Sequence, residues 1–231
     1  MLKRLAAVIA AVCLLVGVPI VSISETGART VLLVYGYHGS AAGWDQMQAR
    51  LRALGILSVE VHLPGEDNLA NAAVIRDLVD TIVRARGPGA SVDIVAHSMG
   101  GLSSRWYAKF LGGSPDSGVP LIAHYVSLGT PQYGLPAACS LPLMNGGQMC
   151  PTGPFLARLN DGDDTPGETA YTTIFSTDDG LVPVPAARLD GGACFVQVAG
   201  VNHFALRSDA TVFARVLSAL RDTCPGVMQT P

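Results

Sequence analysis

The stretch that decides the fold is Val92-Asp93-Ile94-Val95-Ala96-His97-Ser98-Met99-Gly100-Gly101. Its first half is rich in β-branched residues, as buried strands are, and an amphipathic segment follows over residues 102–111. The small residues between the two let a strand turn into a helix without Cβ clashes. Such a turn holds Ser98 at its tip, strained and with its hydroxyl exposed. The pattern A-x-S-x-G therefore predicts that Ser98 is a nucleophile.

Short apolar segments alternate with helix-like segments along the rest of the chain. The apolar segments are typical of buried strands and cover residues 31–35, 57–63, 92–96, 122–128, 171–176 and 194–199. The helical patterns cover residues 44–54, 68–86, 102–111 and 204–222. Because strand and helix alternate, we expect an α/β fold, a compact and mostly parallel sheet with helices on both faces. Ligands bind such a sheet beyond the carboxyl ends of its strands.

The N-terminus has the pattern of a secretory signal peptide over residues 1–24. Two basic residues, Lys3 and Arg4, precede an apolar stretch, and cleavage is equally compatible with Ser24 or Ala28. An uncleaved membrane anchor is the alternative interpretation. The remaining chain, residues 29–225, is long enough for one catalytic domain with a single core, and we expect it outside the cell.

Charge and composition exclude several kinds of partner. The chain has 15 basic and 18 acidic residues, and removal of residues 1–24 leaves a net charge of −5 without any basic run. Nucleic-acid binding is therefore not expected. We expect a monomer whose partner is a small ester or lipid, with transient contact to a lipid surface at most.

Four cysteines follow the signal: Cys139, Cys150, Cys194 and Cys224. An even number in an exported chain favours disulfides over a metal site, and none of the spacings suits zinc. The strand from Cys194 rises roughly 20 Å and the next helix returns roughly 28 Å, which brings Cys194 near Cys224. Cys139 and Cys150 then pair by exclusion.

A serine nucleophile needs a base, and the base needs a carboxylate that orients it. His203 follows the last predicted strand and precedes a helix, so it suits the base better than the other histidines do. The loop after the strand over 171–176 offers Asp178 and Asp179, and we favour Asp179 because a turn glycine and an apolar run follow it. The order Ser98, Asp179, His203 is that of the α/β-hydrolase fold.

Acyl transfer also needs two backbone N–H donors for the oxyanion. One donor is the residue after the nucleophile, Met99. The second is expected in the loop after the first strand, where glycines permit close approach of the backbone, and Tyr37 is our candidate. Neither a metal ion nor another cofactor is needed for this chemistry.

Four motifs together resemble a known family: AHSMGG (96–101), SLGTP (127–131), FSTDD (175–179) and VQVAGVNH (196–203). They look like those of small secreted bacterial triacylglycerol lipases, the class 2 lipases of the α/β-hydrolase superfamily. The resemblance covers about residues 30–220. It implies that Ser98, Asp179 and His203 form the triad and that Tyr37 and Met99 supply the oxyanion donors. The sequence departs from the family at Tyr35, where relatives usually have histidine, and in a cysteine-bearing excursion over residues 135–154.

The resulting prediction is an exported serine hydrolase that cleaves carboxylic esters, acylglycerols above all. Leu181, Val182, Phe204 and Leu206 flank the acid and the base, so they are candidates for an apolar substrate-binding wall. The fold and the triad do not separate this activity from that of a thioesterase, a polyester depolymerase or an acyltransferase. A binding protein on an inactive hydrolase scaffold is the alternative from another class.

The longest irregular segment covers residues 135–166 and is dense in Gly, Pro, Asn and Asp. It lacks an amphipathic helical pattern and carries two cysteines, so we do not expect a hinged lid domain. Oxygen-bearing side chains cluster at residues 160–168, but Pro166 stands where a calcium loop of the EF-hand type needs glycine. We interpret this cluster as a solvated acidic turn.

Overall fold

The computed structural model describes residues 29–116 and 118–229, which build one seven-stranded sheet in the order β2-β1-β3-β4-β5-β6-β7. The six predicted strands are confirmed and run parallel to one another. A seventh, which the sequence did not reveal, is the edge strand β7 and pairs antiparallel with β6. The strands are β1 (Thr30–Val34), β2 (Ser58–Glu60), β3 (Val92–His97), β4 (Ile122–Leu128), β5 (Ala170–Ser176), β6 (Cys194–Val198) and β7 (Val227–Met228).

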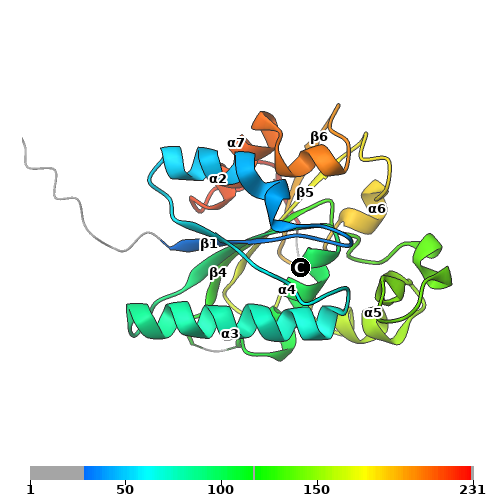
Figure 1. Ribbon diagram of the computed structural model, residues 1–231, viewed down its shortest axis with the longest axis horizontal. Helices are drawn as coiled ribbons and strands as arrows, with labels where there is room; N and C mark the ends of the chain where they lie inside the picture. The colour runs from blue at the N-terminus through cyan, green and yellow to red at the C-terminus, as the bar shows by residue number, and fades with distance from the viewer. Residues whose placement is uncertain (1–28, 117, 230–231) are drawn as a thin grey trace, which may run out of the picture.

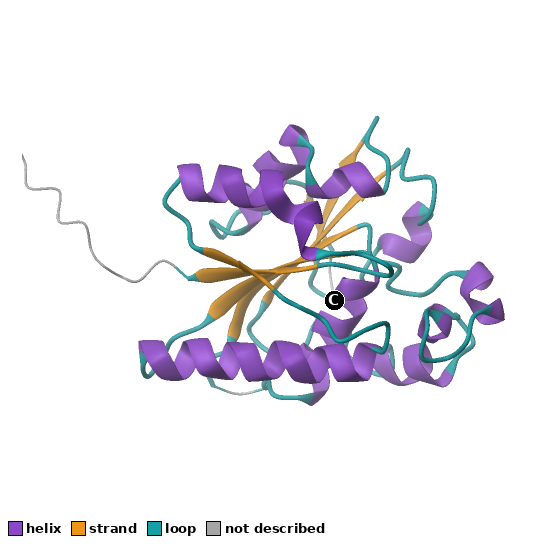
Figure 2. Cartoon of the chain, viewed as in Figure 1, coloured by secondary structure: helices purple, strands orange, loops and turns teal. Residues whose placement is uncertain are grey.

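Helices cover both faces of the sheet, as predicted. Helices α2 (Asp45–Ala53) and α7 (Ala210–Ala219) pack on one face, and α3 (Asn68–Arg86) and α4 (Met99–Phe110) on the other (Figures 1 and 2). Successive side chains of β1 point to opposite faces of the sheet, which explains the two layers. Val31 and Leu33 belong to the buried cluster that includes residues of α2 and α7, whereas Leu32 and Val34 belong to the cluster that includes residues of α3 and α4. Because strands β1 to β6 are parallel, the loops after β1, β3, β4, β5 and β6 meet at the carboxyl ends of the strands.

The helix predicted over residues 204–222 is wrong in its extent. The structure has a 3₁₀ helix, η4 (Phe204–Arg207), followed by a separate helix α7. Asp209 lies between them, and its carboxylate accepts hydrogen bonds from the amides of Thr211 and Val212. This N-cap starts a new helix and so breaks the apolar pattern that continues across it.

The excursion after β4 is more ordered than the sequence suggested. It contains two 3₁₀ helices, η2 (Pro136–Ser140) and η3 (Gly147–Met149), and the helix α5 (Pro154–Leu159). The rings of Trp106 and Phe155 stack with centroids 5.1 Å apart and join α5 to α4. Two other short elements are η1 (Ala41–Trp44) and α6 (Val184–Ala187).

Both predicted disulfides are confirmed. Cys139 pairs with Cys150 inside the excursion, and Cys194 at the start of β6 pairs with Cys224 after α7. The predicted signal peptide, residues 1–24 with its alternative cleavage site at Ala28, lies outside the described residues. Among the residues that the structure does describe, no helix is long and apolar enough to cross a membrane.

Candidate active site

Ser98 lies on a tight turn between β3 and α4, where the sequence predicted it. Its backbone has φ 55° and ψ −133°, a conformation that residues with a Cβ rarely adopt. Gly100 and Gly101 allow the turn, because a Cβ on either would collide with Tyr35 or Thr130 on neighbouring strand ends. The amide of Ser98 donates to the carbonyl oxygen of Leu128 at 2.9 Å, which continues the β3–β4 pairing to Ser98 itself.

Asp179 and His203 form a buried pair at the carboxyl ends of β5 and β6. His203 Nδ1 lies 3.0 and 2.9 Å from the two carboxylate oxygens of Asp179, and both residues are only 4% exposed. The His203 amide also donates to the Asp179 carbonyl oxygen at 2.9 Å. The carboxylate is held in turn by the amides of Leu181 and Val182 at 3.0 and 2.6 Å. This geometry orients the imidazole so that its Nε2 is left for another partner.

Gly129, directly after β4, makes room for this pair. Its φ is +56°, and a Cβ there would lie 2.8 Å from Asp179 Oδ2 and 3.2 Å from His203 Nδ1. Any side chain would therefore displace Asp179 or His203. The sequence motif 127–131 pointed to this segment but not to this function of its glycine.

His97 connects the nucleophile turn to the loop that carries His203. His97 Nε2 lies 2.9 Å from the main-chain oxygen of His203, and the two ring centroids are 4.6 Å apart. His203 thus lies beside the residue that precedes Ser98. No hydrogen bond in the described part of the chain joins Ser98 to His203, and in free enzymes such bonds often tighten only when substrate binds.

The two aspartates of the acid loop have different surroundings. Asp178 is exposed, and its carboxylate accepts hydrogen bonds from the Gly200 amide at 2.6 Å and from Thr177 Oγ1 at 2.8 Å. These bonds, the one from Gly200 foremost, lower the pKa of Asp178. Asp178 therefore links the loop after β5 to the loop after β6 from outside, whereas Asp179 points inward to His203.

The loop after β1 lies against the nucleophile turn. A Cβ at Gly36 would lie 2.6 Å from Ser98 Cβ and 2.9 Å from the Met99 nitrogen, so the backbone before Tyr37 touches the turn itself. Among residues 29–116 and 118–229, neither the Tyr37 amide nor the Met99 amide donates to a protein acceptor. Two free N–H donors on adjacent segments are what an oxyanion site requires.

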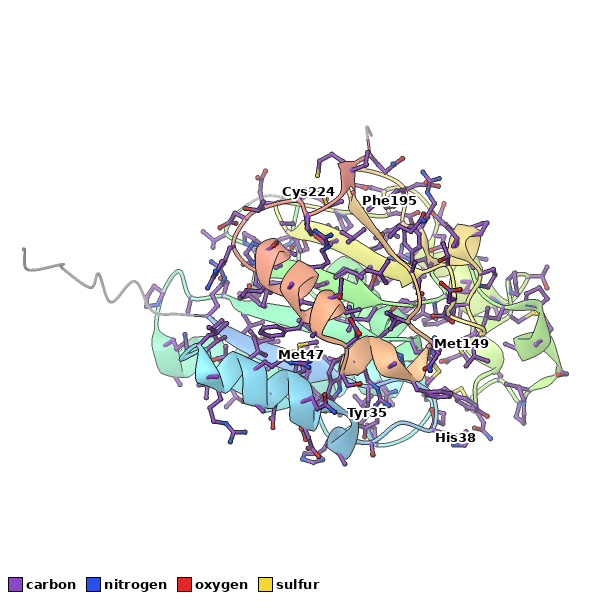
Figure 3. All side chains as sticks on the ribbon, turned by 90° about the horizontal axis from the view of Figure 1, so that it is seen from above. Tyr35, His38, Met47, Met149, Phe195 and Cys224 are labelled. Atoms are coloured by element: carbon purple, nitrogen blue, oxygen red, sulfur yellow. A yellow bond between two sulfur atoms is a disulfide. The ribbon has the colours of Figure 1, made fainter. Side chains whose placement is uncertain are left out.

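Tyr35, where the sequence departs from the family pattern, binds the segment after β2 through its hydroxyl group. Its hydroxyl accepts a hydrogen bond from the Leu63 amide at 2.9 Å and lies 3.3 Å from the Leu63 carbonyl oxygen. The side chain therefore ties the loop after β1 to the segment after β2. Figure 3 shows Tyr35 and His38 on this loop from above.

The four residues of the predicted apolar wall differ in their exposure. Leu181 is 54% and Phe204 is 64% exposed, whereas Val182 is nearly buried and reaches a hollow beside the acid loop. Leu206 is fully buried behind Gly129, because η4 turns it into the core, so it contributes no exposed surface to such a wall. The hollow measures about 250 Å³ and is lined by residues 176, 177 and 179–184.

The acidic segment 160–168 is not simply a solvated turn. Asp164 forms an ion pair with the buried Arg105 at 2.7 Å, and Asn160 accepts from the same guanidinium at 2.9 Å. The segment thereby fastens the excursion to α4. Within the described ranges, no group of three or more His, Cys, Asp or Glu side chains is arranged to hold a metal ion.

A strained serine beside a buried histidine–aspartate pair, in the order Ser98, Asp179, His203, agrees with one family of enzymes. A model of the lipase (class 2) family matches residues 65–217, about two thirds of the chain. The chain belongs to the class 2 lipase family. It is therefore an ester-hydrolysing serine hydrolase with the α/β-hydrolase fold.

Solved structures with the same fold include lipases from bacteria and fungi. Bacillus licheniformis lipase BlEst2 in its mature form matches 85% of this class 2 lipase and 93% of its own chain, at 18% identity and a TM-score of 0.68. Staphylococcus hyicus lipase matches 85% and 95%, at 11% identity and a TM-score of 0.63. Aspergillus fumigatus lipase B matches 88% at 18% identity and a TM-score of 0.68, and the chain spans only 55% of its length.

Proposed function

We propose that this class 2 lipase hydrolyses carboxylic esters, acylglycerols above all, through an acyl-enzyme on Ser98. The observation that carries the proposal is the buried contact of His203 with Asp179, held next to the strained Ser98 by the His97 contact. A serine hydroxyl becomes a useful nucleophile only when a base accepts its proton, and we assign that function to His203.

In this mechanism Ser98 Oγ attacks the ester carbonyl carbon while its proton moves to His203 Nε2. Asp179 accepts a hydrogen bond from Nδ1 and stabilises the imidazolium that forms. His203 then returns the proton to the departing alcohol, which leaves an acyl group on Ser98. Water then attacks the acyl group while His203 accepts its proton. His203 passes this proton to Ser98 Oγ, and the carboxylic acid leaves.

The negative oxygen of each tetrahedral intermediate is stabilised by the amides of Met99 and Tyr37. Both amides lack a protein acceptor in the described residues, and the Gly36 contact places their segments together. Removal of one donor of this kind typically costs about 10²- to 10³-fold in turnover. Acyl chains would lie along Leu181 and Phe204, whose side chains are exposed next to the acid and the base.

We also propose that the protein is exported. The basic and apolar residues 1–24 have the pattern of a signal peptide, and two disulfides are stable in an oxidising compartment. Edman sequencing of the protein recovered from the medium of an expressing culture would locate the cleavage site at Ser24 or Ala28. Retention of the complete chain in the membrane fraction would favour the anchor instead.

A serine-directed fluorophosphonate probe tests the catalytic site. We expect it to label Ser98 in the native protein and not in the unfolded one, whereas a binding protein on this scaffold would not react. A panel of acylglycerols, simple esters, thioesters and polyester films, with and without added alcohol, then tests the substrate class. Faster turnover of thioesters or polyester, or transfer to the alcohol in place of water, would replace the acylglycerol assignment.

A further inference from the structure

The Cys139–Cys150 bond closes a short loop, residues 139–150, that we call the disulfide loop. It contains a buried polar side chain that the mechanism above does not use, Gln148, which is 2% exposed. A buried amide is costly unless its hydrogen bonds are satisfied, so its partners show what it holds in place.

Gln148 ties the disulfide loop to the start of α3. Its Oε1 accepts hydrogen bonds from the amide and the side-chain Nδ2 of Asn68, at 2.7 and 2.9 Å. Its Nε2 donates to Asp67 Oδ1 at 2.9 Å, the same oxygen that caps α3. Asn68 Oδ1 in turn accepts from Ser103 Oγ of α4 at 2.7 Å.

The segment that Gln148 holds supports the loop after β1. Glu66, next to Asp67, accepts a hydrogen bond from the amide of His38 at 2.9 Å, one residue beyond Tyr37. The disulfide loop also touches Tyr37 directly, because a Cβ at Gly146 would lie 2.9 Å from Cε2 of the tyrosine ring. Tyr37 is thus held by the disulfide loop on its side chain and, through Glu66, on the backbone that follows it.

The other oxyanion donor contacts the same part of the fold. Met99 belongs to a cluster of buried side chains that includes Ala138 and Met149, each the chain neighbour of one of the two bonded cysteines, and Tyr37 packs against this cluster. Met149 and His38 lie at the same end of the molecule in Figure 3. The disulfide loop therefore supports both donor segments at once.

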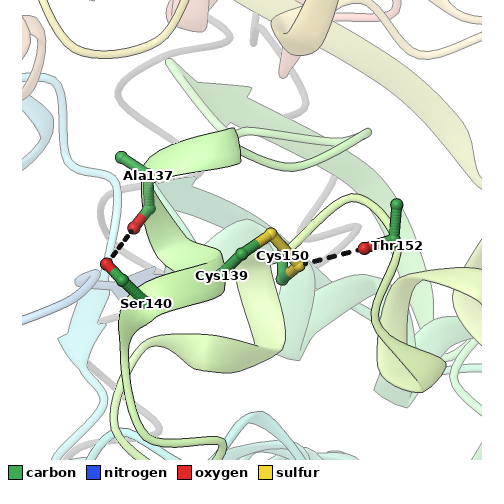
Figure 4. The surroundings of a disulfide bond; sticks show 5 residues. All are labelled: Ala137, Cys139, Ser140, Cys150 and Thr152. Carbon is green, nitrogen blue, oxygen red and sulfur yellow. Dashed lines mark hydrogen bonds between the residues drawn. A yellow bond between two sulfur atoms is a disulfide. The ribbon is translucent and has the colours of Figure 1, made fainter.

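We propose that Gln148 and the Cys139–Cys150 bond are positioning elements of the oxyanion hole. This inference rests on the proposed function, in which the Tyr37 and Met99 amides bind the oxyanion. The catalytic value of such donors depends on fixed placement, since a displacement of about 1 Å can cost on the order of 10²-fold in rate. The disulfide closes the loop at the exposed Cys139, beside the hydrogen bonds of Ser140 Oγ to the Ala137 carbonyl oxygen and between Cys150 Sγ and Thr152 Oγ1 (Figure 4).

The first variant is Gln148→Met, which keeps the shape and removes the hydrogen bonds. We expect kcat per titrated active site to fall at least tenfold, while KM changes less than twofold. An alkylboronic acid, which mimics the tetrahedral intermediate, should lose affinity in the same proportion. Loss of folded protein alone would lower the number of titrated sites and leave both values per site unchanged.

The second variant is Cys139→Ala/Cys150→Ala, with Cys194→Ala/Cys224→Ala as its matched control. The control opens the disulfide at the other end of β6, and Cys224 lies far from Met149 in Figure 3. We expect the first pair to lower kcat and boronate affinity per site at least tenfold. The control should lower the melting temperature and leave both values unchanged.

The outcomes separate the inference from the proposed function. Full kcat and full boronate affinity in Gln148→Met and in Cys139→Ala/Cys150→Ala would overturn the inference alone. Equal losses in both disulfide variants would also overturn it, because the effect would then be one of general stability. Ester hydrolysis by a Ser98→Ala variant would overturn the catalytic site and this inference with it.

Discussion

His97 Nε2 lies 2.9 Å from the main-chain oxygen of His203, and both imidazoles are buried. Burial lowers the pKa of His97 well below its usual range, and the neighbouring His203 and Arg207 lower it further. His97 is therefore a neutral imidazole that donates a hydrogen bond to the loop of His203. We expect the residue before Ser98 to position His203 through this hydrogen bond.

We expect His97→Phe, which removes the donor and keeps an aromatic ring, to lower kcat about tenfold with little change in KM. His97→Gln, which keeps a donor, should recover part of that loss. Steady-state kinetics per titrated site, with melting temperatures for both variants, check the prediction. Equal kcat values in the two variants would show that the hydrogen bond has no function in catalysis.

The triad predicts that Ser98→Ala, Asp179→Asn and His203→Ala each lower turnover on the order of 10³-fold or more, because the three residues act as a unit. Asp178→Asn should lower turnover only slightly, since the Asp178 carboxylate is exposed and accepts hydrogen bonds only from Gly200 and Thr177. Kinetics of the four variants on one soluble ester decide the ranking. A larger loss in Asp178→Asn than in Asp179→Asn would mean that the acid is misassigned.

We predict that the charge of His124, near the start of β4, makes the stability of the folded protein depend on pH. Burial opposes its charge, but the hydrogen bond and charge of Asp93 and the hydrogen bond of Asp222 outweigh burial and the nearby Arg29, so the pKa of His124 is raised. A raised pKa stabilises the folded state most below the unfolded value, about 6.5, and this stabilisation is lost as the pH rises through the folded pKa.

Urea unfolding of the wild type and His124→Gln should therefore show a difference in free energy that is largest in mild acid and shrinks as the pH rises above about 6.5. Asp222→Asn should reduce the same difference, because it removes the charge of one of the two carboxylates that face the imidazole. A difference that stays constant between acid and alkaline pH would show that His124 does not carry the charge.

The active site should be reachable without a lipid interface. The excursion over residues 135–166 is held by the Cys139–Cys150 bond, by Gln148 and by the Arg105–Asp164 ion pair, so it is a poor candidate for a hinged lid. We expect activity on soluble short- and medium-chain esters and a smooth rate curve as a triglyceride passes its solubility limit. Negligible rates below that limit, followed by a steep rise, would show that a lid exists.

Much of the fold could be predicted from local patterns. The six parallel strands and the helix α3 could be predicted because their apolar residues recur at the spacing of a strand or a helix. Asp67 and Gly87 also mark the start and the end of α3 as its N-cap and C-cap. The edge strand β7 has only two residues, Val227 and Met228, too few for any periodicity. The single helix expected over residues 204–222 failed because one N-cap, Asp209, outweighed an apolar pattern that continues past it.

The sequence by itself determined the strand-turn-helix at Ser98, the order of the candidate triad and the pairing of the cysteines, because each depends on residues close in the chain or on simple element lengths. Only the tertiary structure decided that Gly129 makes room for Asp179 and His203, that Leu206 is buried, that His97 contacts the loop of His203, and that Gln148 binds the start of α3. These contacts join distant segments, so they depend on where the sheet brings its loops together and leave no local pattern.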